Sequence, residues 1–272
     1  MKFPDLPGKN LSDAADAARP ETLAIEYSTT RVVAGAIAHL QRSQGVVQAD
    51  RSPLAESFKM LRNRVLQRLR QDGHSVLAVT SARRIDGKSL AAVNLALALA
   101  ADYDRAVLLV DAELSGQGLQ ALFGLAGAPG LGDHLALGTP IAELLVNPGI
   151  ERFVLLPAGR APAPDSAELL ATRRAQTLLQ EMKLRYADRV VIVDLPPLLD
   201  TADALAFLPH VDTTLMVVEE GTTTLDDLEH VAELLTPFNL IGVAMTQPRE
   251  PEPGRSRPAP WYRRWRRRKS SR

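Results

Sequence analysis

Short runs of apolar, often β-branched residues recur through the middle of the chain. These runs occupy 75–80, 106–111, 153–159, 189–194, 213–219 and 240–245. They are apolar almost continuously rather than at alternate positions, which is typical of strands covered on both faces of a sheet. Helical patterns separate them, most clearly at 88–101, 166–185 and 224–235. This alternation predicts an α/β fold with a doubly wound, mostly parallel sheet.

A helix is predicted before the first strand, over residues 52–70. Its apolar residues return every three or four positions, namely Leu54, Phe58, Leu61, Val65 and Leu69. Ser52 suits the N-cap position and Pro53 the first helical position. A second row, Glu56, Lys59 and Arg62, is charged. From spacing alone, this row is best interpreted as a solvated helix face.

Three regions follow from these patterns. Residues 51–247 form the predicted domain. Residues 1–50 are only weakly periodic apart from a short helical stretch at 31–42, and we expect this arm to be mobile or to depend on a partner. Residues 248–272 are rich in Pro and Arg, which predicts a disordered linker followed by a basic, aromatic end.

Composition narrows the function classes. The 272 residues include no Cys, which excludes disulfides and thiolate metal sites and fits a reducing cytosol. The five His residues show no metal-ligand spacing. The first ten residues lack the apolar core of a signal peptide, and no run approaches the roughly 20 apolar residues that a membrane span needs. We therefore expect a cytoplasmic protein.

Charge is balanced overall but unevenly distributed. From Arg249 onward, 10 Arg and Lys face 2 Asp and Glu, a balance of +8, and the remaining 22 basic and 30 acidic residues give −8. The tail also carries Trp261, Tyr262 and Trp265. Basic and aromatic residues together favour an anionic membrane surface or an acidic polymer. A solvated tail is the plainest alternative, and nucleic acid is the least favoured partner.

The loop before the helix at 88–101 carries the clearest chemistry. Gly87, Lys88 and Ser89 lie between a predicted strand and a predicted helix, which is the context of a phosphate-binding loop. Lys88 would reach the β- and γ-phosphates, the Ser89 hydroxyl would ligate Mg²⁺, and backbone N–H groups would hold phosphate oxygens. Ala82 stands where such loops usually have Gly. Alone, the tripeptide also fits an incidental strand–turn–helix.

Two further predicted strands end in a carboxylate, at Asp111 and Asp194. A strand-end Asp can bind Mg²⁺ or accept a proton, although a lone one more often caps the next helix. Ligands of such folds bind at the carboxyl ends of the strands. Together with the loop, the two residues predict a nucleotide-binding site with candidate Mg²⁺ ligands.

Five stretches, in this order and spacing, resemble the cytoplasmic domain of the bacterial tyrosine kinases. That capsular-polysaccharide autokinase family lies within the deviant-Walker, MinD/ParA-like P-loop ATPases. The stretches are "SPLAESFKMLRNRV", "TSARRIDGKSLAAVNLA", "VLLVDAEL", "LPAGRAPAPDSAELL" and "VIVDLPPLLDTADAL". They resemble the family's assembly helix, Walker A loop, Walker A′ motif, Pro-rich stretch before Glu-Leu-Leu, and Walker B motif.

The resemblance implies roles for individual residues. Lys88, Asp111 and Asp194 would be catalytic, with Asp111 activating the attacking tyrosine hydroxyl. The implied Mg²⁺ ligands are Ser89, Asp111 and Asp194. The implied nucleotide-binding loop is Arg83, Arg84, Ile85, Asp86, Gly87, Lys88, Ser89 and Leu90. Glu56, Lys59 and Arg62 would dock on a neighbouring subunit in a ring, which replaces the interpretation of this row as a solvated face.

The chain also departs from the family. Arg84-Ile85-Asp86 stands where Pro-Gly-Glu is common, and Ile85 cannot adopt the positive φ open to Gly without strain. Glu113 stands where the family prefers a second Asp. The C-terminal tyrosine cluster is absent, which leaves Tyr262 as the candidate phosphosite in the tail.

The family resemblance implies an ATP- and Mg²⁺-dependent tyrosine autokinase that regulates capsular or exopolysaccharide biosynthesis and export. A membrane-embedded chain-length or co-polymerase protein would be its partner, and the chain would lie at the inner face of the bacterial cell membrane. The departures keep open a regulatory ATPase or degenerate switch of the same fold. A partitioning or positioning ATPase is disfavoured by the Glu56 helix and the stretch at 156–170.

Overall fold

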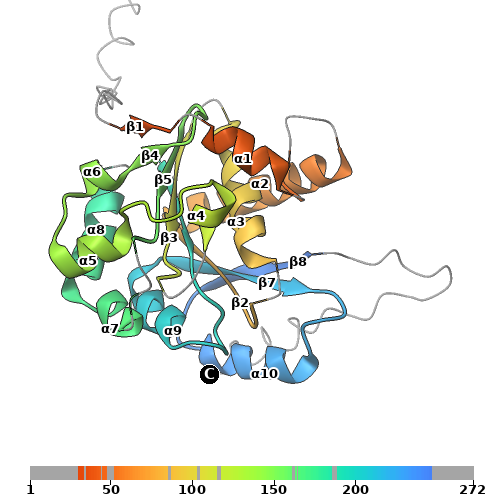
Figure 1. Cartoon of the computed structure of the whole chain (residues 1–272). Coiled ribbons are helices and arrows are strands. Elements are labelled where there is room, and N and C mark those ends of the chain that lie inside the picture. The colour runs from red at the N-terminus through yellow and green to blue at the C-terminus, as the bar shows by residue number, and fades with distance from the viewer. Residues whose placement is uncertain are drawn as a thin grey trace, which may run out of the picture.

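The computed structural model describes residues 30–33, 35–43, 45–47, 52–84, 87–102, 105–114, 118–160, 163, 165–185 and 189–246. Within these ranges an eight-stranded sheet has the order β1-β4-β5-β3-β6-β2-β7-β8 (Figure 1). The strands are β1 (Arg31–Val32), β2 (Val76–Ser81), β3 (Ala106–Asp111), β4 (Val146–Asn147), β5 (Phe153–Leu156), β6 (Arg189–Asp194), β7 (Thr213–Glu219) and β8 (Leu240–Thr246). Neighbouring strands are parallel except β4 and β5. The predicted doubly wound, mostly parallel α/β fold is confirmed.

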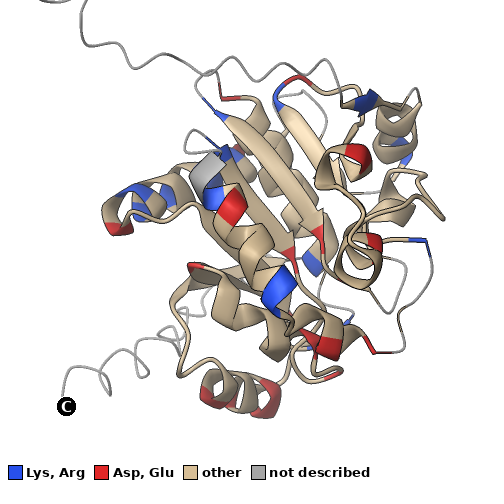
Figure 2. Ribbon diagram, turned by 90° about the vertical axis from the view of Figure 1, so that its left-hand side faces the viewer, with Lys and Arg blue, Asp and Glu red and all other residues tan. Residues whose placement is uncertain are grey.

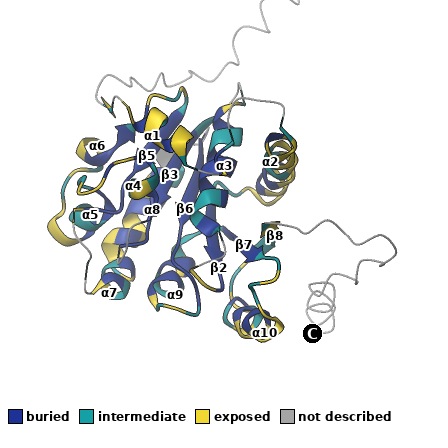
Figure 3. Ribbon diagram, turned by 45° about the vertical axis from the view of Figure 1, so that its right-hand side comes forward, coloured by how far each residue is buried: buried dark blue, intermediate teal, exposed yellow. Residues whose placement is uncertain are grey.

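Helices cover both faces of the sheet (Figure 3). One face packs against α1 (Ala36–Arg42), α2 (Pro53–Asp72), α3 (Lys88–Ala100) and α4 (Leu119–Leu122). The other packs against α5 (Leu131–Leu137), α6 (Ile141–Leu144), α7 (Ser166–Leu170), α8 (Arg173–Arg185), α9 (Asp203–Phe207), the 3₁₀ helix η2 (Leu208–His210) and α10 (Leu225–Leu234). Along β2, Leu77 and Val79 face the first core, and Val76 and Ala78 face the second. Burial on both sides explains why the strands are apolar without alternation.

The helix predicted at 52–70 is confirmed as α2. The Ser52 hydroxyl accepts a hydrogen bond from the Ala55 amide at 3.2 Å, and Pro53 opens the first turn. Gly73 ends the helix in the left-handed conformation, with a φ of 67°, where Gly is favoured. The buried side of α2 packs on α3. No helix in the described part of the chain is long and apolar enough to cross a membrane.

The helical pattern predicted over 166–185 corresponds to two helices, α7 and α8. The break falls at Thr172, whose hydroxyl accepts a hydrogen bond from the Ala175 amide at 3.3 Å. This contact gives the start of α8 an N-cap, so a capping residue lies inside what periodicity alone shows as one helix.

The expected domain boundary at residue 50 also needs correction, because residues 30–47 pack on the folded body. Strand β1 pairs with β4, and Leu40 of α1 is fully buried. Asn94 of α3 accepts from the Val47 amide at 2.7 Å and donates to the Gly45 carbonyl at 2.7 Å. Residues 1–29 and 247–272 lie outside the described residues, so the expectations for the arm and the tail stay predictions there.

Candidate active site

Asp111 and Asp194 end the neighbouring strands β3 and β6. They lie directly opposite each other in the sheet register, and both are completely buried. Figure 2 shows acidic residues at the tips of neighbouring strands. Parallel strands bring their carboxyl ends to one edge of the sheet, and the structure therefore brings together two carboxylates that are 83 positions apart in the sequence (194 − 111 = 83).

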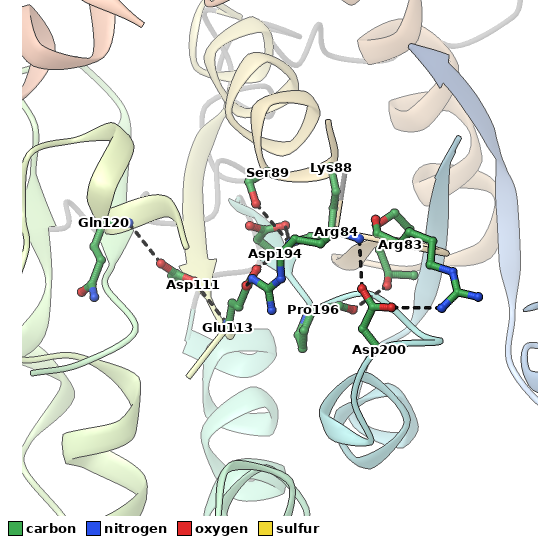
Figure 4. Close-up of polar contacts among 12 residues, drawn as sticks. Arg83, Arg84, Lys88, Ser89, Asp111, Glu113, Gln120, Asp194, Pro196 and Asp200 are labelled. Atoms are coloured by element: carbon green, nitrogen blue, oxygen red, sulfur yellow. Dashed lines mark hydrogen bonds and ion pairs between the residues drawn. The ribbon is translucent and has the colours of Figure 1, made fainter. Parts of the chain in front are cut away.

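The phosphate-loop candidate leaves β2, which pairs with β6, and so starts beside Asp194. Gly87 is the N-cap of α3 and has a φ of 64°. Lys88 follows in the first turn, is nearly completely buried, and donates from Nζ to Asp194 Oδ1 at 2.7 Å and to Glu113 Oε2 at 3.3 Å (Figure 4). Ser89 Oγ lies 3.1 Å from the same Nζ. A buried ammonium, a hydroxyl and carboxylates therefore meet at one helix N-terminus.

Asp111 lies beside this cluster and is held by the backbone. Its carboxylate accepts from the amides of Glu113 at 3.2 Å and Gln120 at 3.1 Å. Gly118 packs so closely against the carboxylate that a Cβ on residue 118 would overlap both oxygens. Burial, followed by the neighbouring charge of Asp194, raises the pKa of Asp111 to about 7. This carboxyl can therefore exchange a proton near neutral pH.

The donor set suits Mg²⁺. Burial raises the pKa of Asp194, and its pairing with Lys88 opposes that shift. Among the described residues, Asp194 Oδ2 is buried without a hydrogen-bond partner. Hydroxyl and carboxylate oxygens are the ligands that Mg²⁺ prefers, with phosphates and water completing its shell. Within the described ranges, no group of three or more His, Cys, Asp or Glu could hold a metal ion by itself.

The two arginines of the loop point in different directions (Figure 4). Arg84 forms an ion pair with Glu113, and so lies over the cluster that holds Lys88. Arg83 instead extends to Asp200 and Asp227, away from Lys88. The predicted loop residues Ile85 and Asp86 lie outside the described residues. Leu90 packs against the hydrophobic core, so its side chain does not take part in the polar cluster.

Sequence reasoning treated Glu113 only as a departure from the family pattern and missed its contacts. The side chains of residues i and i+2 project from the same side of an extended chain. The position of Glu113 two residues after Asp111 could therefore have indicated that both lie at the same site. The contacts of Asp200 and Asp227 were missed as well. No local pattern connects these residues to Arg83, which precedes Asp227 by 144 positions.

The three proposed assembly residues on α2 differ in their surroundings. Glu56 and Lys59 are exposed and pair with each other at 2.7 Å. Arg62 donates to the Ala98 carbonyl near the end of α3 at 3.2 Å. The outer side of α2 therefore presents Glu56 and Lys59 freely, whereas Arg62 is partly engaged within its own subunit.

Known proteins resemble this chain over its central part, although no family model matches it. It is 32% identical over 194 residues to the tyrosine-protein kinase Wzc of Salmonella typhi, covering 71% of this chain and 26% of the relative. It is 35% identical over 215 residues to the succinoglycan biosynthesis transport protein ExoP of Rhizobium meliloti, covering 75% and 26%. The chain thus spans about a quarter of the length of these curated relatives.

Solved structures agree with the sequence comparison. The kinase domain of the Escherichia coli tyrosine kinase ETK has a TM-score of 0.66 and 25% identity, covering 75% of this chain and 80% of that one. The septum site-determining protein MinD of Pyrococcus horikoshii, solved with Mg-ADP, has a TM-score of 0.52 and 21% identity, covering 62% of this chain and 68% of that one. The second likeness shows the P-loop ATPase fold. By sequence and fold together, the central part of this chain is similar to the bacterial tyrosine kinases, and it shares the fold of the MinD-like P-loop ATPases.

Proposed function

We propose that the chain is an ATP- and Mg²⁺-dependent protein-tyrosine kinase that regulates capsular or exopolysaccharide biosynthesis and export. The observation that carries this proposal is the convergence of Lys88 with Asp111 and Asp194 at the edge of the sheet. Phosphoryl transfer requires mainly positioning and charge neutralisation, which such a cluster can supply. The names of the relatives, tyrosine kinases and a succinoglycan transport protein, support the reaction and the process.

Each residue then has a defined task. Lys88 would exchange its carboxylate partners for the β- and γ-phosphates, beside the free N–H groups at the start of α3. Ser89, Asp111 and Asp194 would hold Mg²⁺, which neutralises phosphate charge when bound. Asp111 would accept the tyrosine hydroxyl proton, a task that its place opposite Asp194 at the edge of the sheet allows.

A regulatory ATPase is the second candidate. The internal ion pairs of Lys88 favour it. Its ammonium is paired with Asp194 and Glu113, and Arg84 binds Glu113 as well. A nucleotide must compete with these internal ion pairs. If binding drives assembly rather than transfer, the chain would act as a nucleotide-dependent switch in polysaccharide export.

Labelled ATP distinguishes the two functions. The protein is incubated with [γ-³²P]ATP and Mg²⁺ beside Lys88→Met and Tyr262→Phe, and both phosphotyrosine and free phosphate are measured. A kinase gives label on tyrosine that disappears in Lys88→Met, and Tyr262→Phe shows whether Tyr262 is the acceptor. Hydrolysis without protein label identifies the switch. Absence of label, hydrolysis and nucleotide binding would reject both functions.

A homo-oligomer, as a ring built through α2, is the proposed assembly. Light scattering after size exclusion should show a smaller particle for Glu56→Ala and Lys59→Ala than for the parent protein. Glu181→Ala, an exposed change on α8, serves as the matched control. Equal masses for all four proteins at high concentration would contradict the role of this helix.

An anionic membrane surface is the proposed partner of the basic tail, beside a membrane-embedded co-polymerase, and both imply a place at the inner face of the cell membrane. The full chain and a chain ending at Gln247 are floated with vesicles of neutral or anionic lipid, and competing RNA is added in a parallel series. Binding to anionic vesicles should require the tail. Unchanged flotation after truncation rejects the membrane role, and preferential loss to RNA would indicate nucleic acid instead.

A further inference from the structure

Four hydrogen bonds between described residues tie the start of the phosphate loop to two distant segments. Arg83 donates to Asp227 Oδ1 from Nε at 3.1 Å and from Nη2 at 2.8 Å, and to Asp200 Oδ1 from Nη1 at 3.3 Å. The Arg84 amide donates to Asp200 Oδ2 at 3.1 Å. One carboxylate therefore binds both a side chain and the backbone of this loop (Figure 4).

Both acceptors are themselves held in place. Asp227 lies in the first turn of α10, where its Oδ2 accepts from the Thr224 hydroxyl at 2.7 Å and from the Thr224 amide at 3.3 Å. Its side chain is only 10% exposed. Such an acceptor loses little freedom when it binds Arg83, which makes this pair more effective than two flexible surface side chains.

Asp200 belongs to a segment that runs beside the loop. The Leu198 amide donates to the Ser81 carbonyl at 2.9 Å, and the Leu199 amide donates to the Ala82 carbonyl at 3.2 Å. These backbone contacts align the segment after β6 with the end of β2. Asp200 extends the alignment by two residues, so that residues 81–84 are held from one side along their whole length.

The residues of the loop explain why contacts from outside it matter. Residues 83 and 84 are both Arg, so no proline ring restricts the backbone angles of this part of the loop. A loop that samples several conformations binds its ligand more weakly than a fixed loop. Its affinity is proportional to the fraction of time that it spends in the binding conformation. External contacts can restore that fraction.

We propose that Arg83, Asp200 and Asp227, which we call the Arg83 clamp, fix the phosphate loop in its binding conformation. Arg83 is then a positioning residue and does not contact the phosphates. By holding the Arg84 amide, the clamp also fixes the origin of the side chain that reaches Glu113. The inference rests on the proposed nucleotide site, but the clamp itself exists without nucleotide and can be measured separately.

Amide hydrogen exchange of the nucleotide-free protein tests the clamp directly. Arg83→Met and Asp227→Asn should each speed exchange in peptides covering residues 82–89 by about fivefold, because the loop opens more often. Asp226→Asn removes the same charge one position earlier, on an exposed side chain that does not contact the loop, and should leave exchange unchanged. Unchanged exchange in both clamp variants would overturn the proposal, whatever the protein does with ATP.

Nucleotide binding tests the consequence. In both clamp variants the Kd for a fluorescent ATP analogue should rise about tenfold, with kcat at saturating ATP changed less than threefold. The double variant, Arg83→Met with Asp227→Asn, should bind ATP no more weakly than Arg83→Met alone, because the two side chains act as one unit. If Arg83→Met does not fold, Arg83→Lys, which keeps the charge but loses the fork of donors, should weaken binding.

Faster exchange with no ATP binding even by the parent protein would reject the proposed function and retain the clamp. Faster exchange with unchanged affinity would reject the positioning role.

Discussion

At the scale of single residues, Gly118 controls Asp111 through the side chain that it lacks. A methyl group on residue 118 would occupy the space of both carboxylate oxygens of Asp111. We expect Gly118→Ala to displace this carboxylate and to lower kcat for tyrosine phosphorylation by about 10- to 100-fold, since small misplacements of reacting groups have effects of that size.

The matched control is Gly242→Ala on β8, where an added Cβ meets nothing within 4 Å. Both variants are assayed for initial rates at saturating ATP, and their unfolding temperatures are compared. Parent-like rates for a folded Gly118→Ala protein would show that the position of Asp111 does not limit the reaction.

The raised pKa of Asp111 predicts a dependence of stability on pH. Below a pH of about 7 the folded protein binds a proton here that the unfolded chain, with an ordinary pKa of 3.8, releases above pH 4. The folded state therefore loses stability as the pH rises from about 4 to about 7, and above pH 7 it carries the full cost of the buried charge. Asp111→Asn should therefore be more stable than the parent at pH 8, by at most about 4 kcal/mol for a shift of about three pKa units. The gap should narrow toward pH 5 and close near pH 4.

Urea unfolding in EDTA, without nucleotide, measures this difference. A parent protein whose stability does not fall relative to Asp111→Asn between pH 5 and pH 8 would show that the carboxyl titrates normally. The expected result means that the ionised carboxylate of Asp111 lowers the stability of the nucleotide-free protein, while it remains available to bind ligands.

The positions of the proposed catalytic residues could be predicted from sequence because each residue ends or begins an element. Lys88, Asp111 and Asp194 follow or precede strong hydrophobic periodicity, and parallel topology gathers strand ends. The Arg83 clamp could not be predicted, since its direction depends on where α10 packs, and a loop Arg has many equally available rotamers.

At the scale of elements, Asp212 joins β2 to α8. Its Oδ2 accepts from the amides of Ser75 at 3.0 Å and Val76 at 2.9 Å, and its Oδ1 receives Lys183 at 2.5 Å. Burial alone would raise the pKa of Asp212, but these hydrogen bonds outweigh burial and lower it. One side chain thus fixes the start of the strand that leads to the proposed phosphate loop.

Asp212→Asn should lower the free energy of unfolding at pH 7 by about 1–3 kcal/mol, the usual effect of losing hydrogen bonds to a charged group. Since the folded pKa is depressed, this stabilisation is complete above pH 3.8 and disappears as the pH falls through the lower, folded value. Urea unfolding at pH 7 and pH 3 measures it, with the exposed change Glu229→Gln as the control. A constant gap at both pH values would contradict the electrostatic origin.

Element boundaries were predictable wherever a long apolar run set them. Strands β3, β6 and β7 begin and end as the sequence indicates. The two-residue strands β1 and β4 escape prediction, because pairing with a distant strand defines them rather than any pattern of their own. The division between α7 and α8 depends on one hydrogen bond to the Thr172 hydroxyl. A single polar residue of this kind does not change the spacing of the apolar residues, so the pattern does not show the break.

At the scale of the whole molecule, the segment before residue 50 contributes to the core. Leu40 is 1% exposed and belongs to the same cluster as the buried residues of α2 and α3. We expect Leu40→Ala to reduce the free energy of unfolding by about 2–5 kcal/mol, which is the range for a large-to-small change in a core. Leu137→Ala, at a position 77% exposed, is the control and should change little. A parent-like midpoint for Leu40→Ala in urea would show that this segment docks only loosely.

The strand order has a consequence for synthesis. Strands β2 and β3 follow each other in the chain but never touch as neighbours, because β6 lies between them. A chain leaving the ribosome therefore cannot complete the centre of the sheet until residue 194 has emerged. Until then the apolar strands that flank the gap have no partner on that side, and their unpaired edges expose the nascent protein to aggregation.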